Sequence, residues 1–132
     1  MVSINQLNSK IKNRYCFSKK LRCPALIGGP FRRGTVERVF IRNPKKPNSA
    51  KRKVCKVIIK LTKRRVDSYI PGIGHSLQKF SQVIVRGGRC QDVPGVRYTC
   101  VKGLLDFSYR EGFIRANRRS LYGIPKIKKQ FL

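Results

Sequence analysis

The residues with the clearest chemical character form one short stretch, Pro44-Lys45-Lys46-Pro47-Asn48-Ser49. Its two prolines fix φ and hold the residues before them extended, so the backbone is stiff before it meets a partner. Two lysines can bind phosphate, while an amide and a hydroxyl can approach a nucleic-acid groove with little loss of conformational entropy. We call residues 43–50 the proline loop and predict that it binds nucleic acid. An ordinary turn with a solvated lysine pair would have the same composition.

A second stretch, residues 86–98, combines guanidinium groups with glycines, and we call it the arginine loop. Arginine can bind phosphate through two parallel hydrogen bonds. The one acid, Asp92, is expected to pair with a neighbouring cation and to fix the shape of the loop. The candidate binding residues are Arg86, Arg89, Asp92, Pro94, Gly95 and Arg97.

The sequence gives little support for catalysis or for metal binding. The chain has one histidine, His75, and five acids, none of them grouped as a nucleophile–base or acid–base motif requires. Five cysteines occur without the close pairs that zinc sites use, so we predict no metal, no cofactor and no enzyme activity. Reduced thiols are expected, with Cys55 and Cys100 in the core. His75 is interpreted as a locally hydrogen-bonded loop residue, or else as a contact to RNA or protein.

The elements that must position these loops are short strands separated by Gly and Pro. Two-residue periodicity and β-branched residues predict strands at Thr35–Ile41, Lys53–Leu61, Val66–Ile70, Gln82–Val85 and Val96–Val101. Five short strands bounded by turn signals favour a small closed barrel, and the OB-fold has this count. Composition alone would also fit an SH3-like barrel. We predict an all-β fold, a five-stranded OB-fold barrel over residues 34–105.

Basic segments flank the predicted barrel. Residues 1–33 are predicted to be a short helix over 3–11, capped by Ser3, followed by an extended arm. The arm residues expected to bind RNA are Lys19, Lys20, Arg22, Arg32 and Arg33. Residues 106–132 are predicted to be a basic C-terminal extension.

The net charge of +27 requires a polyanionic partner, because such a chain repels itself when free. Nucleic acid is the leading candidate, since phosphate neutralisation releases counterions. An anionic membrane surface and acidic proteins are the alternatives. No stretch is apolar for long enough to predict a membrane span, and no homo-oligomer is expected.

At these motifs the chain resembles a known family. The segments PKKPNSA, SYIPGIGHSLQ, RGGRCQDVPGVRY and RRSLYG, with SINQL and CPALIGGPFRRG near the start, resemble the small-subunit ribosomal protein twelve family over nearly the whole chain. The resemblance implies an OB-fold barrel with a long N-terminal arm, which binds small-subunit rRNA at the decoding centre and contributes to translational accuracy. A free RNA chaperone with the same barrel is the alternative function.

The resemblance also implies roles for single residues. Pro47 and Ser49 would approach the codon and its monitoring bases, and Lys45 and Lys46 would brace rRNA phosphates. The segment around Asp92 would form a second brace, and His75 would face tRNA and elongation factors. The partners implied are small-subunit rRNA, other small-subunit ribosomal proteins, mRNA–tRNA at the A site and elongation factors.

The sequence departs from the family pattern at Lys51, Ile73, Lys79 and Gln91. Two of these changes, Ile73 and Lys79, remove acids beside the factor-facing loop. A bias toward Phe, Ile, Asn, Lys and Tyr, as AT-rich coding produces, predicts an organellar protein. We expect a mitochondrial ribosome, with a chloroplast or a bacterial cytoplasm as the alternatives.

Overall fold

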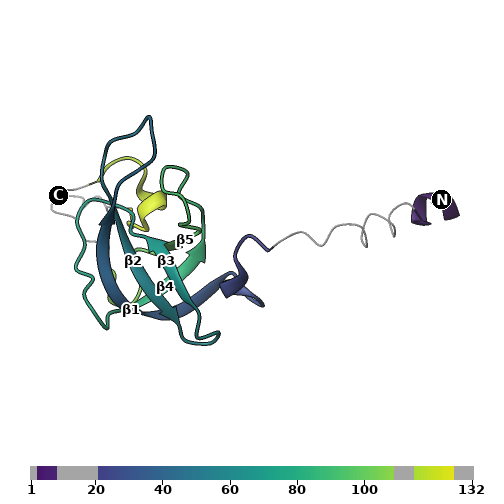
Figure 1. The fold of residues 1–132 in the computed structure, drawn as a ribbon, viewed down its shortest axis with the longest axis horizontal. Helices are drawn as coiled ribbons and strands as arrows, with labels where there is room; N and C mark the ends of the chain where they lie inside the picture. The colour runs from purple at the N-terminus through teal and green to yellow at the C-terminus, as the bar shows by residue number, and fades with distance from the viewer. Residues whose placement is uncertain (1–2, 9–20, 109–114, 127–132) are drawn as a thin grey trace, which may run out of the picture.

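The computed structural model describes residues 3–8, 21–108 and 115–126. Its centre is a closed barrel with strand order β1-β2-β3-β5-β4, in which β4 pairs back onto β1 (Figure 1). Neighbouring strands are antiparallel except for β3 and β5, which run parallel. The strands are β1 (Phe31–Arg42), β2 (Arg52–Ile59), β3 (Arg65–Tyr69), β4 (Gln82–Gly87) and β5 (Tyr98–Cys100). The predicted all-β, OB-fold-like barrel is thereby confirmed.

Each strand overlaps one predicted from the sequence, but β1 begins earlier than Thr35, at Phe31. The residues just before it also contact the barrel. A 3₁₀ turn, η1 (Pro24–Leu26), buries Ala25, whose backbone N–H donates a hydrogen bond to the Tyr98 hydroxyl at 3.1 Å. The segment from Cys23 to β1 therefore packs on the barrel, although its polar composition had predicted an extended arm there.

The barrel interior is filled by small and β-branched side chains. Alternate residues of β2 (Cys55, Val57 and Ile59) point inward with Val83 and Val85 of β4, all fully buried. Cys100 joins them, and its sulfur lies 3.3 Å from that of Cys55. Both thiols are free and buried, as predicted. The hydrogen bond with Cys55 and burial raise the pKa of the Cys100 thiol well above its usual value, so this thiol stays protonated.

A second hydrophobic cluster lies on the opposite face of β2. Val54, Val93 and Val96 are buried together, and Phe40 and Tyr69 pack against them. Val54 belongs to β2, whereas Val93 and Val96 belong to the arginine loop. The loop is therefore attached to the outer wall of the barrel by apolar burial.

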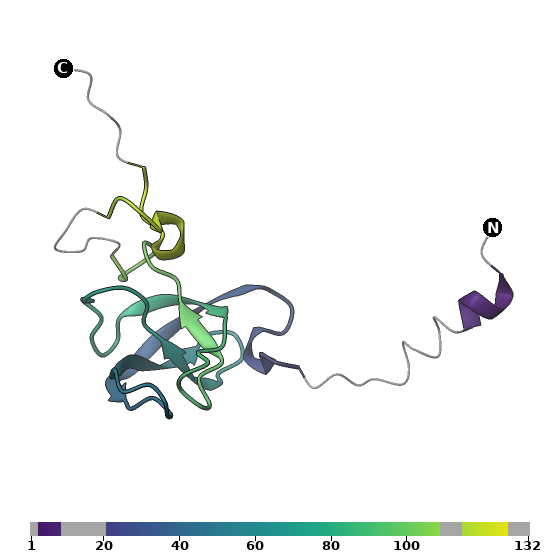
Figure 2. The ribbon, with the colours of Figure 1, turned by 90° about the horizontal axis from the view of Figure 1, so that it is seen from above.

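Helical structure is sparse in the described ranges. Residues 4–8 are helical, and Ser3 caps them as predicted: its Oγ accepts the Gln6 N–H at 3.3 Å, while Gln6 Oε1 accepts the Ser3 N–H at 3.2 Å. The rest of the predicted helix, 9–11, lies outside the described residues. A 3₁₀ turn, η2 (Arg119–Tyr122), lies outside the barrel wall (Figure 2). None of the helical segments described has the length and apolar character needed to cross a membrane.

Gly34 lies where β1 approaches β2 closely. It pairs with Ile59 of β2 on one side and with Val83 of β4 on the other. A Cβ on Gly34 would overlap Cγ1 of Val57 and lie 2.8 Å from the carbonyl oxygen of Ile58. A side chain at this position would push β1 away from β2.

Gly34→Ala should therefore lower the free energy of unfolding by about 1–3 kcal/mol, the usual cost of overpacking a core. Gly29→Ala is the matched control, because its Cβ would meet only the guanidinium of Arg32, at 3.2 Å. Urea unfolding of the two variants measures the difference. Equal unfolding midpoints for both variants would show that β1 is not tightly held at this point.

Candidate nucleic-acid interface

The proline loop joins β1 to β2 and projects beyond the end of the barrel (Figure 1). Residues 45–50 are exposed and Pro44 is partly buried. Inside the loop, the Asn48 N–H donates to the Lys45 carbonyl at 3.1 Å and closes a tight turn. The Lys46–Pro47 peptide bond is cis. The predicted binding groups of the loop therefore share one exposed tip.

Asp92 of the arginine loop makes three contacts that hold this tip. Its Oδ1 accepts the side-chain amide of Asn48 at 2.7 Å, and its Oδ2 accepts the guanidinium of Arg52 at 2.8 Å. Its backbone carbonyl accepts the Lys45 N–H at 2.9 Å. One residue thus joins the two loops that the sequence singled out. The predicted pairing of Asp92 with a nearby cation is present.

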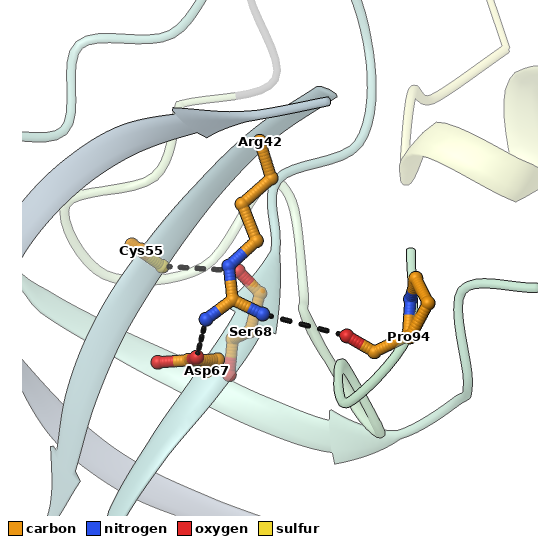
Figure 3. A network of polar contacts seen from close by, with 5 residues as sticks. All are labelled: Arg42, Cys55, Asp67, Ser68 and Pro94. Atoms are coloured by element: carbon orange, nitrogen blue, oxygen red, sulfur yellow. Dashed lines mark hydrogen bonds and ion pairs between the residues drawn. The ribbon is translucent and has the colours of Figure 1, made fainter. Parts of the chain in front are cut away.

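Two arginines flank the proline loop and reach across to the arginine loop. Arg42 ends β1 and Arg52 begins β2, and the two residues face each other in the strand register. Arg42 donates to the carboxylate of Asp67 on β3 at 2.6 Å and to the Pro94 carbonyl at 3.4 Å (Figure 3). Because Arg52 binds Asp92, both stems of the proline loop are tied to the arginine loop.

Arg52 and Asp92 form an ion pair in which the Arg52 guanidinium is firmly held in its charged form. The hydrogen bond to Asp92 raises the pKa of the Arg52 guanidinium above its ordinary value. The side chains are 32% and 28% exposed, so water screens the pair only in part. Its Coulomb attraction is consequently stronger than that of a fully exposed pair.

The arginine loop has its own internal hydrogen bonds. The Gly88 N–H donates to the Arg97 carbonyl, and the Cys90 N–H donates to the Val96 carbonyl, both at 3.1 Å. With Val93 and Val96 buried beneath it, the loop has a fixed conformation from which polar groups point outward. Pro94, Gly95, Arg89 and Arg97 are exposed, and Arg86 is partly buried.

The arm residues occupy different environments. Arg22 is exposed and lines a groove of about 670 Å³ with Arg89 and Arg97, so an arm residue and the arginine loop share one cationic surface. Arg32 is used within the fold, since its Nη2 donates to the Ile27 carbonyl at 3.0 Å. Arg33 is exposed on β1. Lys19 and Lys20 lie outside the described residues.

His75 makes a local hydrogen bond, which is the first of its two predicted interpretations. Its Nδ1 accepts the Leu77 N–H at 3.2 Å. Burial, followed by the positive charge of Lys53, lowers the pKa of the imidazole. His75 is therefore neutral at pH 7. No hydrogen bond within the described residues joins it to either loop.

Each acid of the described residues lies close to a basic group or a backbone N–H of the protein itself. Asp67 and Asp92 form the two short ion pairs, and Glu37 lies 3.9 Å from Arg65. Asp106 accepts the Gln82 N–H at 2.7 Å. The remaining cations therefore need counter-charge from outside the chain. No three Cys, His, Asp or Glu side chains gather as a metal site within the described ranges.

Sequence reasoning missed Arg42 and Arg52, the residues that position the proline loop. Both had counted only toward the general basic charge. Their positions could have indicated this role, because Arg42 is the last residue of β1 and Arg52 is the first residue of β2, one on each side of the loop. The outer contact of Val54 was also missed, although the imperfect alternation of β2 had left both of its faces partly apolar.

Comparison with known proteins agrees with this geometry. The profile of the family described as Ribosomal protein S12/S23 matches residues 19–121. A protein of Dictyostelium discoideum named small ribosomal subunit protein uS12m is 47% identical over 131 residues, covering 97% of this chain and 91% of that protein. A protein of Acanthamoeba castellanii with the same name is 50% identical over 105 residues, covering 80% of this chain and 82% of that protein. Both loops lie within the matched range.

Removing the Asp92 carboxylate should loosen the proline loop. In Asp92→Ala, Asn48 and Arg52 lose their acceptor, and each hydrogen bond to a charged group contributes about 1–2 kcal/mol when partly exposed. Hydrogen exchange at the amides of Lys45 and Asn48 should become about tenfold faster. Glu37→Ala is the control, since it removes the same charge outside both loops. Unchanged exchange in Asp92→Ala would show that Asp92 does not hold the tip.

The lowered pKa of His75 gives a pH dependence with a definite sign. Protonation is easier in the unfolded chain, whose imidazole pKa is near 6.5, than in the folded one. The contribution to stability is therefore complete above pH 6.5 and is lost as the pH falls below that value. Urea unfolding between about pH 8 and pH 5 should show this loss for the wild type and a smaller loss for His75→Gln. Parallel profiles for the two proteins would contradict the assignment.

Proposed function

Because the chain belongs to the ribosomal protein S12/S23 family, we propose that it binds rRNA at the decoding centre of the small ribosomal subunit and contributes to translational accuracy. Membership of this family makes it a structural, non-enzymatic constituent of the small subunit. Ribosomal RNA and ribosomal proteins are accordingly its partners. The decoding position and the effect on accuracy are the finer part of the proposal.

One observation carries that finer part: the proline loop is exposed at its tip and rigidly held at its base. Lys45 and Lys46 are exposed, while Arg42, Arg52 and Asp92 fix the stems. A loop that is ordered before binding loses little entropy when RNA docks against it. It can therefore hold rRNA bases in one geometry and make a poorly matched codon–anticodon helix costly to accommodate.

The proposal gives the two loops different roles, in agreement with the contacts that each of them makes. In the proposal, Lys45 and Lys46 bind rRNA phosphates, and Pro47 and Ser49 approach the codon and its monitoring bases. The arginine loop supports this tip and adds Arg89 and Arg97 as further phosphate contacts. Such contacts set position and carry little sequence information, whereas RNA shape and 2′-hydroxyls supply specificity.

His75 belongs to the factor-facing part of the proposal. It lies in the loop between β3 and β4, is partly buried and is neutral at pH 7. Its other ring nitrogen, Nε2, can then donate one hydrogen bond to a tRNA or to an elongation factor. Ile73 beside it is 65% exposed and adds an apolar contact to this surface.

The relatives also fix the compartment. Their shared name, uS12m, denotes the mitochondrial form of this small-subunit protein, so the chain belongs to the mitochondrial ribosome. This agrees with the organellar origin predicted from the residue bias.

Lys46→Ala tests the decoding proposal. Losing one phosphate contact of about 1.4 kcal/mol should change the misreading frequency at near-cognate codons by up to about tenfold. Assembly should persist, because the barrel and the remaining cations still bind rRNA. Misincorporation assays on ribosomes carrying the variant measure the first effect, and sedimentation measures the second.

Lys60→Ala is the matched control, because it removes an equal charge at the far end of β2. It should leave the misreading frequency unchanged. Normal accuracy together with lost assembly in Lys46→Ala would refute the decoding role. A wild-type chain that sediments away from small subunits at moderate salt would instead be a free RNA chaperone.

A further inference from the structure

A groove lined by tyrosines and arginines lies beside the arginine loop. It has a volume of about 460 Å³ and lies between the arginine loop, the end of β3 and η2. Two tyrosine rings, Tyr69 and Tyr122, line it together with Arg52, Arg86 and Arg89. Tyr122 belongs to the segment RRSLYG, to which the proposed function assigns no role.

Tyr122 is held as a platform by its neighbours. The guanidinium of Arg115 lies 3.9 Å from the centre of its ring, which places the charge against one ring face. Gly123, which follows it, has φ +65°, and a Cβ there would lie 2.6 Å from the Lys102 carbonyl. The C-terminal segment therefore approaches the barrel closely at this point. That approach brings the Tyr122 ring to the edge of the groove.

Tyr69 supplies the second ring, on the barrel side. It packs on the outer hydrophobic cluster, and burial raises the pKa of its hydroxyl. The ring is thus rigid and its hydroxyl stays protonated at pH 7. Both rings line the same groove, so a flat ligand bound there can contact them.

The charges of the groove select an anion. Arg86 is fixed by a hydrogen bond from its Nη1 to the Gly87 carbonyl at 3.3 Å. Arg89 is exposed and makes no hydrogen bond or ion pair to any described residue. The only acid in the lining is Asp92, and Asn48 and Arg52 already occupy its two oxygens. A ligand that fits must carry both a flat ring and a negative group.

We propose that this groove binds one unstacked nucleotide of single-stranded RNA, with its base against Tyr122 and its phosphate against Arg86 and Arg89. Aromatic side chains that stack on bases beside a cationic track for the backbone are the usual means of single-strand recognition. The inference rests on the proposed function, because it gives the rRNA contact a defined pocket. It also makes the C-terminal segment part of the binding surface.

A second basic groove provides the control. Arg33, Lys60 and Lys63 line it beside Phe31, which is 56% exposed. It contains one ring, on the barrel wall, and no opposing aromatic surface. Phe31→Leu therefore removes an exposed ring next to cations. Phe31 pairs with Arg86 in the strand register but does not itself line the proposed site.

The experiment measures binding of the purified full chain to two labelled probes by fluorescence anisotropy. One probe is a ten-residue oligouridylate, and the other is an abasic ribose–phosphate chain of equal length. The wild type should prefer the oligouridylate. Tyr122→Leu should weaken oligouridylate binding by about tenfold, in the range expected for one stacked base, and leave abasic binding unchanged. Tyr122→Phe and Phe31→Leu should keep the wild-type preference.

Equal affinity of the wild type for both probes, or loss of the preference in Phe31→Leu alone, would overturn the proposal. Photo-crosslinking of a 4-thiouridine oligomer to the wild-type chain needs no variant, so it decides the matter if Tyr122→Leu does not fold. Adducts on Tyr122 or Tyr69 support the groove, and adducts only elsewhere refute it. Failure here leaves the accuracy phenotype of Lys46→Ala intact, so the two proposals fail separately.

Discussion

The attachment of the arginine loop to the two stems of the proline loop is the constraint on which the functional surface depends. Arg42 ends β1 and Arg52 begins β2, and the two face each other in the strand register, so their like charges repel. Asp67 and Asp92 neutralise them. The Arg52–Asp92 pair also joins the two loops, so in this pair the offset of the repulsion and the positioning of the loop come from the same atoms.

The scarcity of acids explains why these few carboxylates have such large effects. The chain has five acids against thirty-two Lys and Arg, so each carboxylate has many possible partners. The described acids bind partners at strand ends and loop bases, and these contacts hold the backbone in place. Most of the cations left over in the described ranges are at least partly exposed, although Lys102 is buried. Folding therefore leaves the molecule with an excess of charge that only a polyanion can neutralise, and RNA phosphates meet that need.

The sequence predicted the barrel better than the contacts between its loops. Strands follow from local periodicity and turn residues, so all five were recognisable. The pairing of Asp92 with a cation was expected, but its particular partners, Asn48 and Arg52, lie 44 and 40 positions away in the chain. Residue spacing does not encode such distant pairs. Packing of Ala25 on Tyr98 was missed for the same reason, because Pro and Gly around it indicated an arm. The roles of Lys46 and His75 toward RNA remain predictions.

The sequence of β2 is informative because it departs from the apolar–polar alternation expected of a strand with one exposed face. A strand with one face in water alternates apolar and polar residues, whereas β2 has apolar residues on both faces. Cys55, Val57 and Ile59 fill the barrel, and Val54 on the other face is fully buried beneath Val93 and Val96. An apolar residue on the outer face of a barrel strand, next to a basic loop, thus indicates that a second loop is seated there. Hydrophobic burial beneath the arginine loop gives its exposed charges a fixed direction, which a solvated loop would lack.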